Sequence, residues 1–157
     1  MSVRLAPLDK VGREAVLEET RHELAEGMVR VGDWSPEAAR ERAEKLVAAV
    51  LTEGPNAAEQ SFFAILSEPG GPPVGDLWVE TGTDSDPHRA TINLIRIAPE
   101  FRRRGYARAA LGALETYLRE RGVRIVGLHA FGDNASANRL YSVAGFRPAH
   151  IEWRRDL

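Results

Sequence analysis

The first third of the chain repeats apolar residues with the period of an α-helix. After an apolar stretch at residues 3–5 that can form a short strand, apolar positions recur every three or four residues over 13–31, with glutamates between them. A second such segment follows Ser35-Pro36-Glu37, which supplies a capping serine, a proline at the first helical position and a carboxylate in the first turn. Its apolar face runs to Val50, and Gly54-Pro55 are expected to end it. The pattern therefore predicts one strand and two amphipathic helices.

The middle of the chain changes to the two-residue period of β-strands. Apolar runs at residues 62–66 and 74–81 flank the turn residues of 69–73, and this arrangement predicts a hairpin. Residues 89–97 return to strand character after a polar loop. Three consecutive strands are therefore expected.

Residues 89–97 carry an irregular alternation. Ile92 and Leu94 share one phase, whereas Ile95 and Ile97 share the other, so the period slips by one residue at Leu94-Ile95. Such a slip predicts either a strand buried on both faces or a β-bulge that redirects the backbone.

The last third alternates helix and strand again. The expected elements are a helix over 107–121, a strand over 123–131, a helix that Asp133-Asn134 cap and that runs to Ala144, and one or two closing strands over 146–153. The complete order is β-αα-βββ-α-β-α-β. This order predicts an α/β fold with a mixed central sheet flanked by helices.

Length and composition limit the possible classes of protein. Residues 1–157 match the size of a single domain, and the chain is 43% hydrophobic and 28% charged, which is enough apolar material for a packed core. The absence of cysteine excludes disulfides, thiolate nucleophiles and cysteine-ligated metals. Four scattered histidines show no metal-ligand spacing, so no metal is expected. No apolar run resembles a membrane helix or a signal peptide, which predicts a cytoplasmic protein without membrane partners.

The net charge of -2 conceals a division between the two halves. Residues 1–88 carry 17 acidic and 8 basic residues, whereas residues 89–157 carry 6 acidic residues and 13 arginines. A basic half favours a polyanionic ligand and an acidic half a cationic one, although the charges could simply cover solvated faces. Without a recognised motif or aromatic residues interleaved on a sheet, the arginines do not indicate a nucleic-acid partner.

The most informative segment joins the strand of residues 89–97 to the next helix. It places a glycine and a small residue among arginines, at Arg102, Arg103, Arg104, Gly105, Tyr106, Ala107 and Arg108. The first turn of a helix leaves backbone N–H groups without partners, and the helix dipole adds partial positive charge there. Gly105 allows unusual backbone angles and a close approach, so a pyrophosphate can bind to the amides. The alternative is an ordinary basic loop, because neither a P-loop nor a Rossmann fingerprint is present.

A second segment, residues 134–146, aligns polar and small residues on one helical stripe. Asn134, Ala137, Tyr141 and Ala144 stand at i, i+3, i+7 and i+10. An amide, a small gap and a phenol therefore share one face. Taken alone, Tyr141 would be interpreted as a core aromatic residue whose hydroxyl bonds a carbonyl.

Together the two segments resemble the GCN5-related N-acetyltransferase (GNAT) family. The family's Arg/Gln-x-x-Gly-x-Gly/Ala is similar to Arg102-x-x-Gly105-x-Ala107, and its Asn-x-x-Ala-x-x-Leu-Tyr-x-x-x-Gly-Phe matches residues 134–146 at every named position. The resemblance covers residues 91–146 closely. It implies a single GNAT-like acetyltransferase domain, in which residues 89–146 form the acetyl-CoA-binding core and residues 1–60, a strand and a helical pair, form the acceptor side.

The resemblance also implies roles for individual residues in binding acetyl-CoA. The amides and arginines of residues 102–108 would hold the pyrophosphate, and the backbone of Ile95 and Ile97 would pair with the pantetheine arm and the thioester carbonyl. Asn134 would bind the pantetheine beside the small Ala137. Tyr141 would face the thioester sulfur.

The implied reaction is direct attack of an amine on the thioester, with Tyr141 protonating the leaving thiolate. Some family members carry a glutamate base at the position that aligns with Thr91, and threonine cannot serve as that base. Glu80 is the substitute that we expect to act, directly or through water. The acceptor is expected to be a small-molecule amine. A peptide or protein N-terminus and a non-catalytic acyl-CoA-binding module remain alternatives, and the protein could be a monomer or a homodimer.

Overall fold

A computed structural model describes residues 1–32, 34–51, 58–67, 70–82 and 86–157. The elements are β1 (Arg4–Pro7), α1 (Lys10–Arg30), α2 (Pro36–Val50), β2 (Glu59–Leu66), β3 (Pro73–Thr81), β4 (Arg89–Ile97), a 3₁₀ turn η1 (Pro99–Phe101), α3 (Tyr106–Glu120), β5 (Ile125–Leu128) and α4 (Ala135–Val143). The predicted serine cap is confirmed, because Ser35 Oγ accepts the N–H of Ala38 at 3.3 Å. The predicted helix stop at Gly54-Pro55 lies outside the described residues.

The five strands form one sheet in the order β1-β2-β3-β4-β5, and the predicted mixed sheet is confirmed. Neighbouring strands are antiparallel except for β4 and β5, which run parallel. The parallel ladder is short, since it begins at Arg89 opposite Ile125 and ends at Ile92 opposite Leu128. Beyond Ile92, β4 continues for five residues after β5 has ended.

The predicted irregularity of β4 is a β-bulge. Leu94 lies opposite Trp78 and Ile92 lies opposite Val79, so Asn93 is an extra residue in β4. The slip therefore falls one residue earlier than the alternation predicts. Ile92 joins the apolar cluster under α3, whereas Leu94 joins the cluster under α1 and α2. The expectation that these two residues share a face is wrong, because the bulge turns the strand between them.

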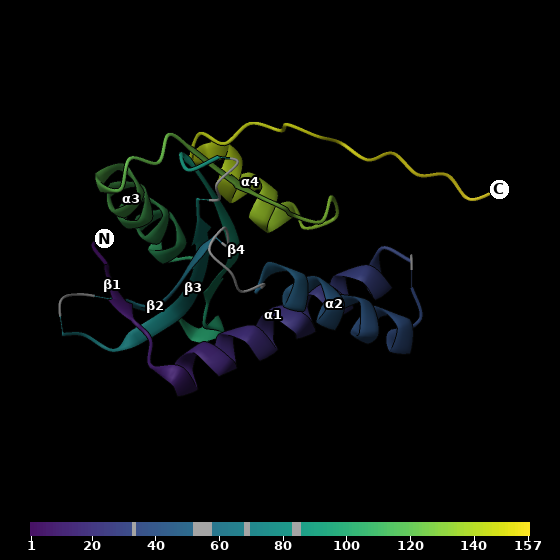
Figure 1. Ribbon diagram of the computed structural model, residues 1–157, viewed down its shortest axis with the longest axis horizontal. Coiled ribbons are helices and arrows are strands. Elements are labelled where there is room, and N and C mark those ends of the chain that lie inside the picture. The colour runs from purple at the N-terminus through teal and green to yellow at the C-terminus, as the bar shows by residue number, and fades with distance from the viewer. Residues whose placement is uncertain (33, 52–57, 68–69, 83–85) are drawn as a thin grey trace.

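Two apolar clusters hold the helices against opposite faces of the sheet (Figure 1). On one face, Leu77, Val79 and Ile92 pack with Leu111 and Leu114 of α3. Partly buried residues of α4, including Tyr141, pack on this same cluster. On the other face, Phe62 and Trp78 pack with Val16 of α1 and Val47 of α2. The sheet thus separates α3 and α4 from the two N-terminal helices.

The predicted closing strands over 146–153 are wrong. No regular element follows α4, and Figure 1 shows the last residues leaving the body of the protein as an extended tail. Ile151 and Trp153 are 66% and 87% exposed. The prediction relied on alternating apolar residues, but a strand also needs a pairing edge and a face on which to bury them. Phe146 packs on the cluster under α3, but residues 147–157 are all exposed and pair with no strand, and β5 is shorter than residues 123–131.

Candidate active site

The turn between β4 and α3 adopts left-handed backbone conformations at two positions. Gly105, the residue before α3, has φ 85° and ψ 0°, and Arg103 has φ 62°. Residues other than glycine rarely adopt such backbone angles, so the conformation of Arg103 indicates a constrained turn. Ala109 N–H donates to Gly105 O at 3.0 Å, and the amides before it belong to the first helical turn, which has no carbonyl of its own to bond. The turn therefore presents N–H groups at the positive end of the α3 dipole.

The arginines of this turn have different surroundings. Arg102 Nε donates to the carbonyl of Ile97 at 2.8 Å, so its side chain ties the turn back to the end of β4. The Arg104 guanidinium lies 5.9 Å from the ring centroid of Phe101. Arg102, Arg103, Arg104 and Arg108 are all exposed, whereas Tyr106 and Ala107 pack against the cluster under α3. Positive charge thus surrounds the amides while the helix itself is anchored to the core.

The part of β4 beyond Ile92 lies next to this turn. Ile95 is partly buried and Ile97 is 8% exposed, and both lie on the α3 side of the sheet. The Ile97 carbonyl already accepts the Arg102 bond, so one of its two acceptor sites is occupied. Asn93 Nδ2, at the bulge, is shut off from solvent and has no hydrogen-bond partner among the described residues. This section of β4 is the one that no longer pairs with β5.

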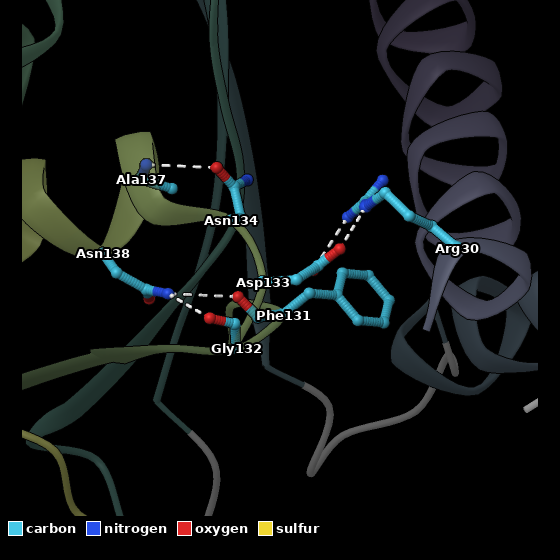
Figure 2. Close-up of polar contacts among 7 residues, drawn as sticks. All are labelled: Arg30, Phe131, Gly132, Asp133, Asn134, Ala137 and Asn138. Carbon is cyan, nitrogen blue, oxygen red and sulfur yellow. Dashed lines mark hydrogen bonds and ion pairs between the residues drawn. The ribbon is translucent and has the colours of Figure 1, made fainter. Parts of the chain in front are cut away.

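Helix α4 brings the second predicted segment to the same region. Asn134 Oδ1 accepts the N–H of Ala137 at 3.1 Å and caps the helix (Figure 2). This cap does not use the two N–H donors of the Asn134 amide. Asn134 is exposed, whereas Ala137 and Tyr141 are partly buried. Ala137 and Tyr141 of the predicted stripe therefore face the protein, whereas Asn134 lies at the exposed start of α4.

Tyr141 lies between apolar packing and a carboxylate. Its ring contacts Phe146 edge to face, with centroids 5.8 Å apart. Burial raises the pKa of the Tyr141 phenol above its ordinary value of 10.0, and the negative charge of Glu23 on α1 raises it further. Tyr141 is consequently a neutral proton donor at physiological pH.

Glu23 is a residue that the sequence analysis did not assign to the site. It retains an exposed surface, but the protein packed around its carboxylate raises its pKa above 4.5, and Glu19 raises it further. Arg96 and Arg102 act in the opposite direction, and Glu26 adds a smaller upward contribution. The only sequence signal for this residue is the run of glutamates along residues 13–31, which does not show which one faces α4.

Contacts at both ends of this helical face hold α1 across the site. Glu19 lies 3.7 Å from Arg96 of β4, and Arg96 also pairs with Asp76 of β3 at 2.6 Å. About two turns further along the same face, Gly27 contacts the ring of Phe131 so closely that any Cβ there would overlap it. These contacts join α1 both to β4 and to the segment that follows β5.

A third contact reaches the start of α4. Figure 2 shows Arg30 extending from α1 to the carboxylate of Asp133, next to the Phe131 ring. Asn138 Nδ2 donates to the carbonyls of Phe131 and Gly132, both at 3.2 Å, and so fixes the loop that carries these residues. The β5–α4 loop is therefore held from both α1 and α4.

Glu80 lies in a different part of the sheet. It is opposite Gln60 of β2 and Thr91 of β4, and Thr91 is in the section of β4 that still pairs with β5. Gln60 Nε2 lies 3.4 Å from Glu80 Oε2 and also bonds the carbonyl of Val50 at the end of α2. Glu23 is thus near enough to Tyr141 for its charge to act on the phenol, whereas Glu80 lies beside the end of α2.

In the described part of the chain, no group of three or more histidine, aspartate or glutamate side chains could hold a metal ion. None of the helices described is long and apolar enough to cross a membrane.

Comparisons with known proteins agree on one family. Residues 28–146 match the model of the acetyltransferase (GNAT) family. The protein named "Uncharacterized N-acetyltransferase YycN" of Bacillus subtilis (strain 168) is 28% identical over 158 residues, which span all of both chains. A crystal structure of YycN superposes with a TM-score of 0.87 and covers 99% of each chain at 27% identity. A structure of AAC(6')-Iy in complex with CoA-S-monomethyl-acetylneamine shares the fold, with a TM-score of 0.54 at 17% identity over the full length of both chains.

Proposed function

Because this chain belongs to the GNAT family of acetyltransferases, we propose that it moves the acetyl group of acetyl-CoA to a primary amine of a small molecule. The chain is an acetyl-CoA-dependent acyltransferase by family. The acceptor and the roles of individual residues are our proposal. The observation that carries it is the juxtaposition of an amide-rich turn at the start of α3 with the section of β4 that β5 leaves unpaired.

The hydrogen-bond donors and positive charges of this turn suit a pyrophosphate. The left-handed residues Arg103 and Gly105 bend the backbone just before α3, so that consecutive N–H groups and the helix dipole meet at one point. A Cβ built on Gly105 meets no protein atom within 4 Å, so the space beside this backbone is open to a ligand. Arg103, Arg104 and Arg108 add charge, and the side chain of Arg102 braces the turn.

The neighbouring strand suits the pantetheine arm and the acetyl group. The peptide groups of Ile95 and Ile97 would pair with the arm as a further strand would, and the donors of the Asn134 amide would reach it from α4. The small Ala137 leaves room beside it. The Ile95 N–H would donate to the thioester oxygen, where negative charge develops during attack.

Catalysis would then consist of positioning and one proton donor. Two substrates held in near-attack geometry can gain about 7–11 kcal/mol from proximity alone. The chain has no cysteine that could carry the acetyl group, so the amine would attack the thioester directly. Tyr141, kept neutral by burial and by Glu23, would protonate the leaving sulfur.

The acceptor would approach from the N-terminal side of the protein. Residues 1–60 supply α1 and α2, whose acidic side chains favour a cationic amine, while residues 89–146 supply the acetyl-CoA site, and the whole of residues 1–157 acts as one domain. A peptide α-amine is a second candidate, since the same charge would attract it. Glu80 stays a predicted base for either acceptor.

The direct test measures thiol release from acetyl-CoA with polyamines, aminoglycosides, amino acids and short peptides. Turnover with a small amine supports the proposal, and turnover confined to peptides moves the function to the peptide class. Tight acetyl-CoA binding without thiol release to any amine would instead indicate a non-catalytic acyl-CoA-binding module.

A further inference from the structure

Helix α1 spans the place where β4 and β5 separate. Glu19 reaches Arg96 on β4, and Gly27, two turns later, lies against Phe131 in the segment that follows β5. Glu23 is four residues from each, and such residues lie on one helical face. Its carboxylate is therefore carried over the space between the two strands, where the acetyl group of the cosubstrate would lie.

Tyr141 faces the same space from the opposite side of the sheet. It lies on α4, which packs with the cluster under α3, and yet the charge of Glu23 on α1 acts on its phenol. This is possible because β5 ends at Leu128 and no strand beyond it separates the two helices in this part of the sheet. The Glu23 carboxylate on α1 is thus near enough to the Tyr141 phenol on α4 for its charge to act on it.

We propose that Glu23 is the general base of the reaction and that its substrate is a primary alkylamine that is protonated at neutral pH. The inference rests on the proposed function and adds the base and the charge state of the acceptor. The ammonium group would enter from the α1 side, bind to the Glu23 carboxylate and lose a proton to it, and the neutral nitrogen would then face the thioester.

The protons and bonds of this scheme balance. Glu23 takes the first proton from the ammonium, the nitrogen forms a bond to the acetyl carbon, and the carbon–sulfur bond breaks. Tyr141 gives its proton to the sulfur, and the second proton of the nitrogen returns to the Tyr141 oxygen through water as the amide forms. Glu23 then releases its proton to solvent. The net change is one ammonium and one thioester converted to one amide, one thiol and one proton.

The surroundings of Glu23 suit a base better than those of Glu80. Partial burial and the nearby Glu19 raise the Glu23 pKa, which makes its carboxylate a stronger proton acceptor than an ordinary glutamate. Glu80 is instead beside Gln60 and the end of α2, in the part of the sheet where β4 and β5 are still paired.

The groups that face Glu23 come from every element around it. Glu19 and Glu26 belong to α1, Arg96 to β4, Arg102 to the β4–α3 turn and Tyr141 to α4. As the proposed base, Glu23 is expected to give the wild type an acidic limb in its rate profile, and Arg96 and Arg102 oppose the upward shift of its pKa.

The test compares Glu23→Gln with Glu18→Gln, which changes an exposed glutamate of α1 that pairs with Arg21 away from the site. With an alkylamine found active in the panel, Glu23→Gln is expected to lower kcat by about 10²- to 10⁴-fold at pH 7 and to abolish the acidic limb. Acetyl-CoA affinity, measured by calorimetry, should not change. Raising the pH above the pKa of the amine should restore much of the rate, because the amine then needs no base. Glu18→Gln should behave as the wild type.

Two further measurements keep the inference open to contradiction. An aryl amine, which is already neutral at pH 7, should be acetylated by Glu23→Gln at nearly the wild-type rate. If Glu23→Gln does not fold, Glu23→Asp serves instead and should retain the acidic limb with a lower kcat. An unchanged kcat and acidic limb in Glu23→Gln overturns the inference, and loss of that limb in Glu80→Gln would assign the base to Glu80. A wild-type protein that acetylates no amine would contradict the proposed function itself.

Discussion

Ile92 and Leu94 point to opposite faces of the sheet although they are two residues apart in one strand. Asn93 between them is the extra residue of a β-bulge, and the parallel pairing with β5 ends at Ile92. The bulge therefore coincides with the point at which β4 leaves its neighbour. The local irregularity of one strand determines where a ligand could reach the edge of the sheet.

Asn93→Leu tests whether the bulge residue serves a ligand. Asn93 Nδ2 is buried without a partner in the described structure, so an apolar side chain of similar size should leave the melting temperature unchanged or slightly raise it. If the amide donates to the cosubstrate, acetyl-CoA affinity should fall by about 1 kcal/mol, or about fivefold. Calorimetry and thermal unfolding measure the two effects, and an unchanged affinity would show that the amide has no ligand role.

Tyr141→Phe tests the proton donor. The substitution keeps the ring that packs on Phe146, so the melting temperature and acetyl-CoA affinity should change little. The kcat should fall by about 10²- to 10⁴-fold, with similar Michaelis constants. Because burial and Glu23 raise the Tyr141 pKa, the alkaline loss of activity from this group should lie at higher pH than for an ordinary tyrosine. Full turnover in Tyr141→Phe, with chemistry limiting the rate, would mean that the sulfur takes its proton from solvent.

Gly105→Ala and Gly122→Ala form a matched pair for the pyrophosphate site. Both glycines have φ near +80° with no atom near the added Cβ, and they lie at opposite ends of α3. Each substitution should lower the free energy of unfolding by about 1–2 kcal/mol, because alanine is strained at a positive φ. Gly105→Ala should also weaken CoA binding clearly more than Arg103→Ala does, whereas Gly122→Ala should bind CoA normally. Equal CoA affinities in the two glycine variants would contradict the proposal that the turn before α3 binds the pyrophosphate.

Gly27→Ala tests the contact between α1 and the segment after β5. The new methyl group would overlap the Phe131 ring, so we expect a loss of about 1–3 kcal/mol and a higher KM for the amine. The double variant Gly27→Ala/Phe131→Leu removes the overlap and should regain stability. Chemical denaturation and steady-state kinetics measure both quantities. A single variant as stable as the wild type would indicate that the ring moves aside without cost.

The repeating patterns of the chain predict the elements well where they are amphipathic. The helices at 13–31 and 107–121 and the strand at 89–97 were predicted to within three residues of α1, α3 and β4, because the helices each bury a repeating apolar face and β4 carries closely spaced apolar residues on both of its faces. The closing strand failed for the converse reason. Alternation in residues 146–153 marks a potential strand, but pairing depends on a distant edge that local pattern does not encode.

The candidate site, too, could be predicted only where its signals are local in the sequence. The motifs at 102–107 and 134–146 are local, and the sequence predicts both the left-handed Gly105 and the inward stripe that contains Tyr141. The proximity of Tyr141 to Glu23 depends on how α1 crosses the sheet. The two residues are 118 positions apart, and a single sequence does not show that they lie close together. The bulge was visible only as a slip in phase, and its exact residue depended on the register with β3.

The most direct measurement follows a labelled acetyl group from acetyl-CoA in a single turnover with an active small amine, together with thiol release. Direct transfer predicts that labelled amide and free thiol form at the same rate and in equal amounts, with no label on the protein at any time. Thiol release without labelled amide, or label that first accumulates on the protein, would contradict this account.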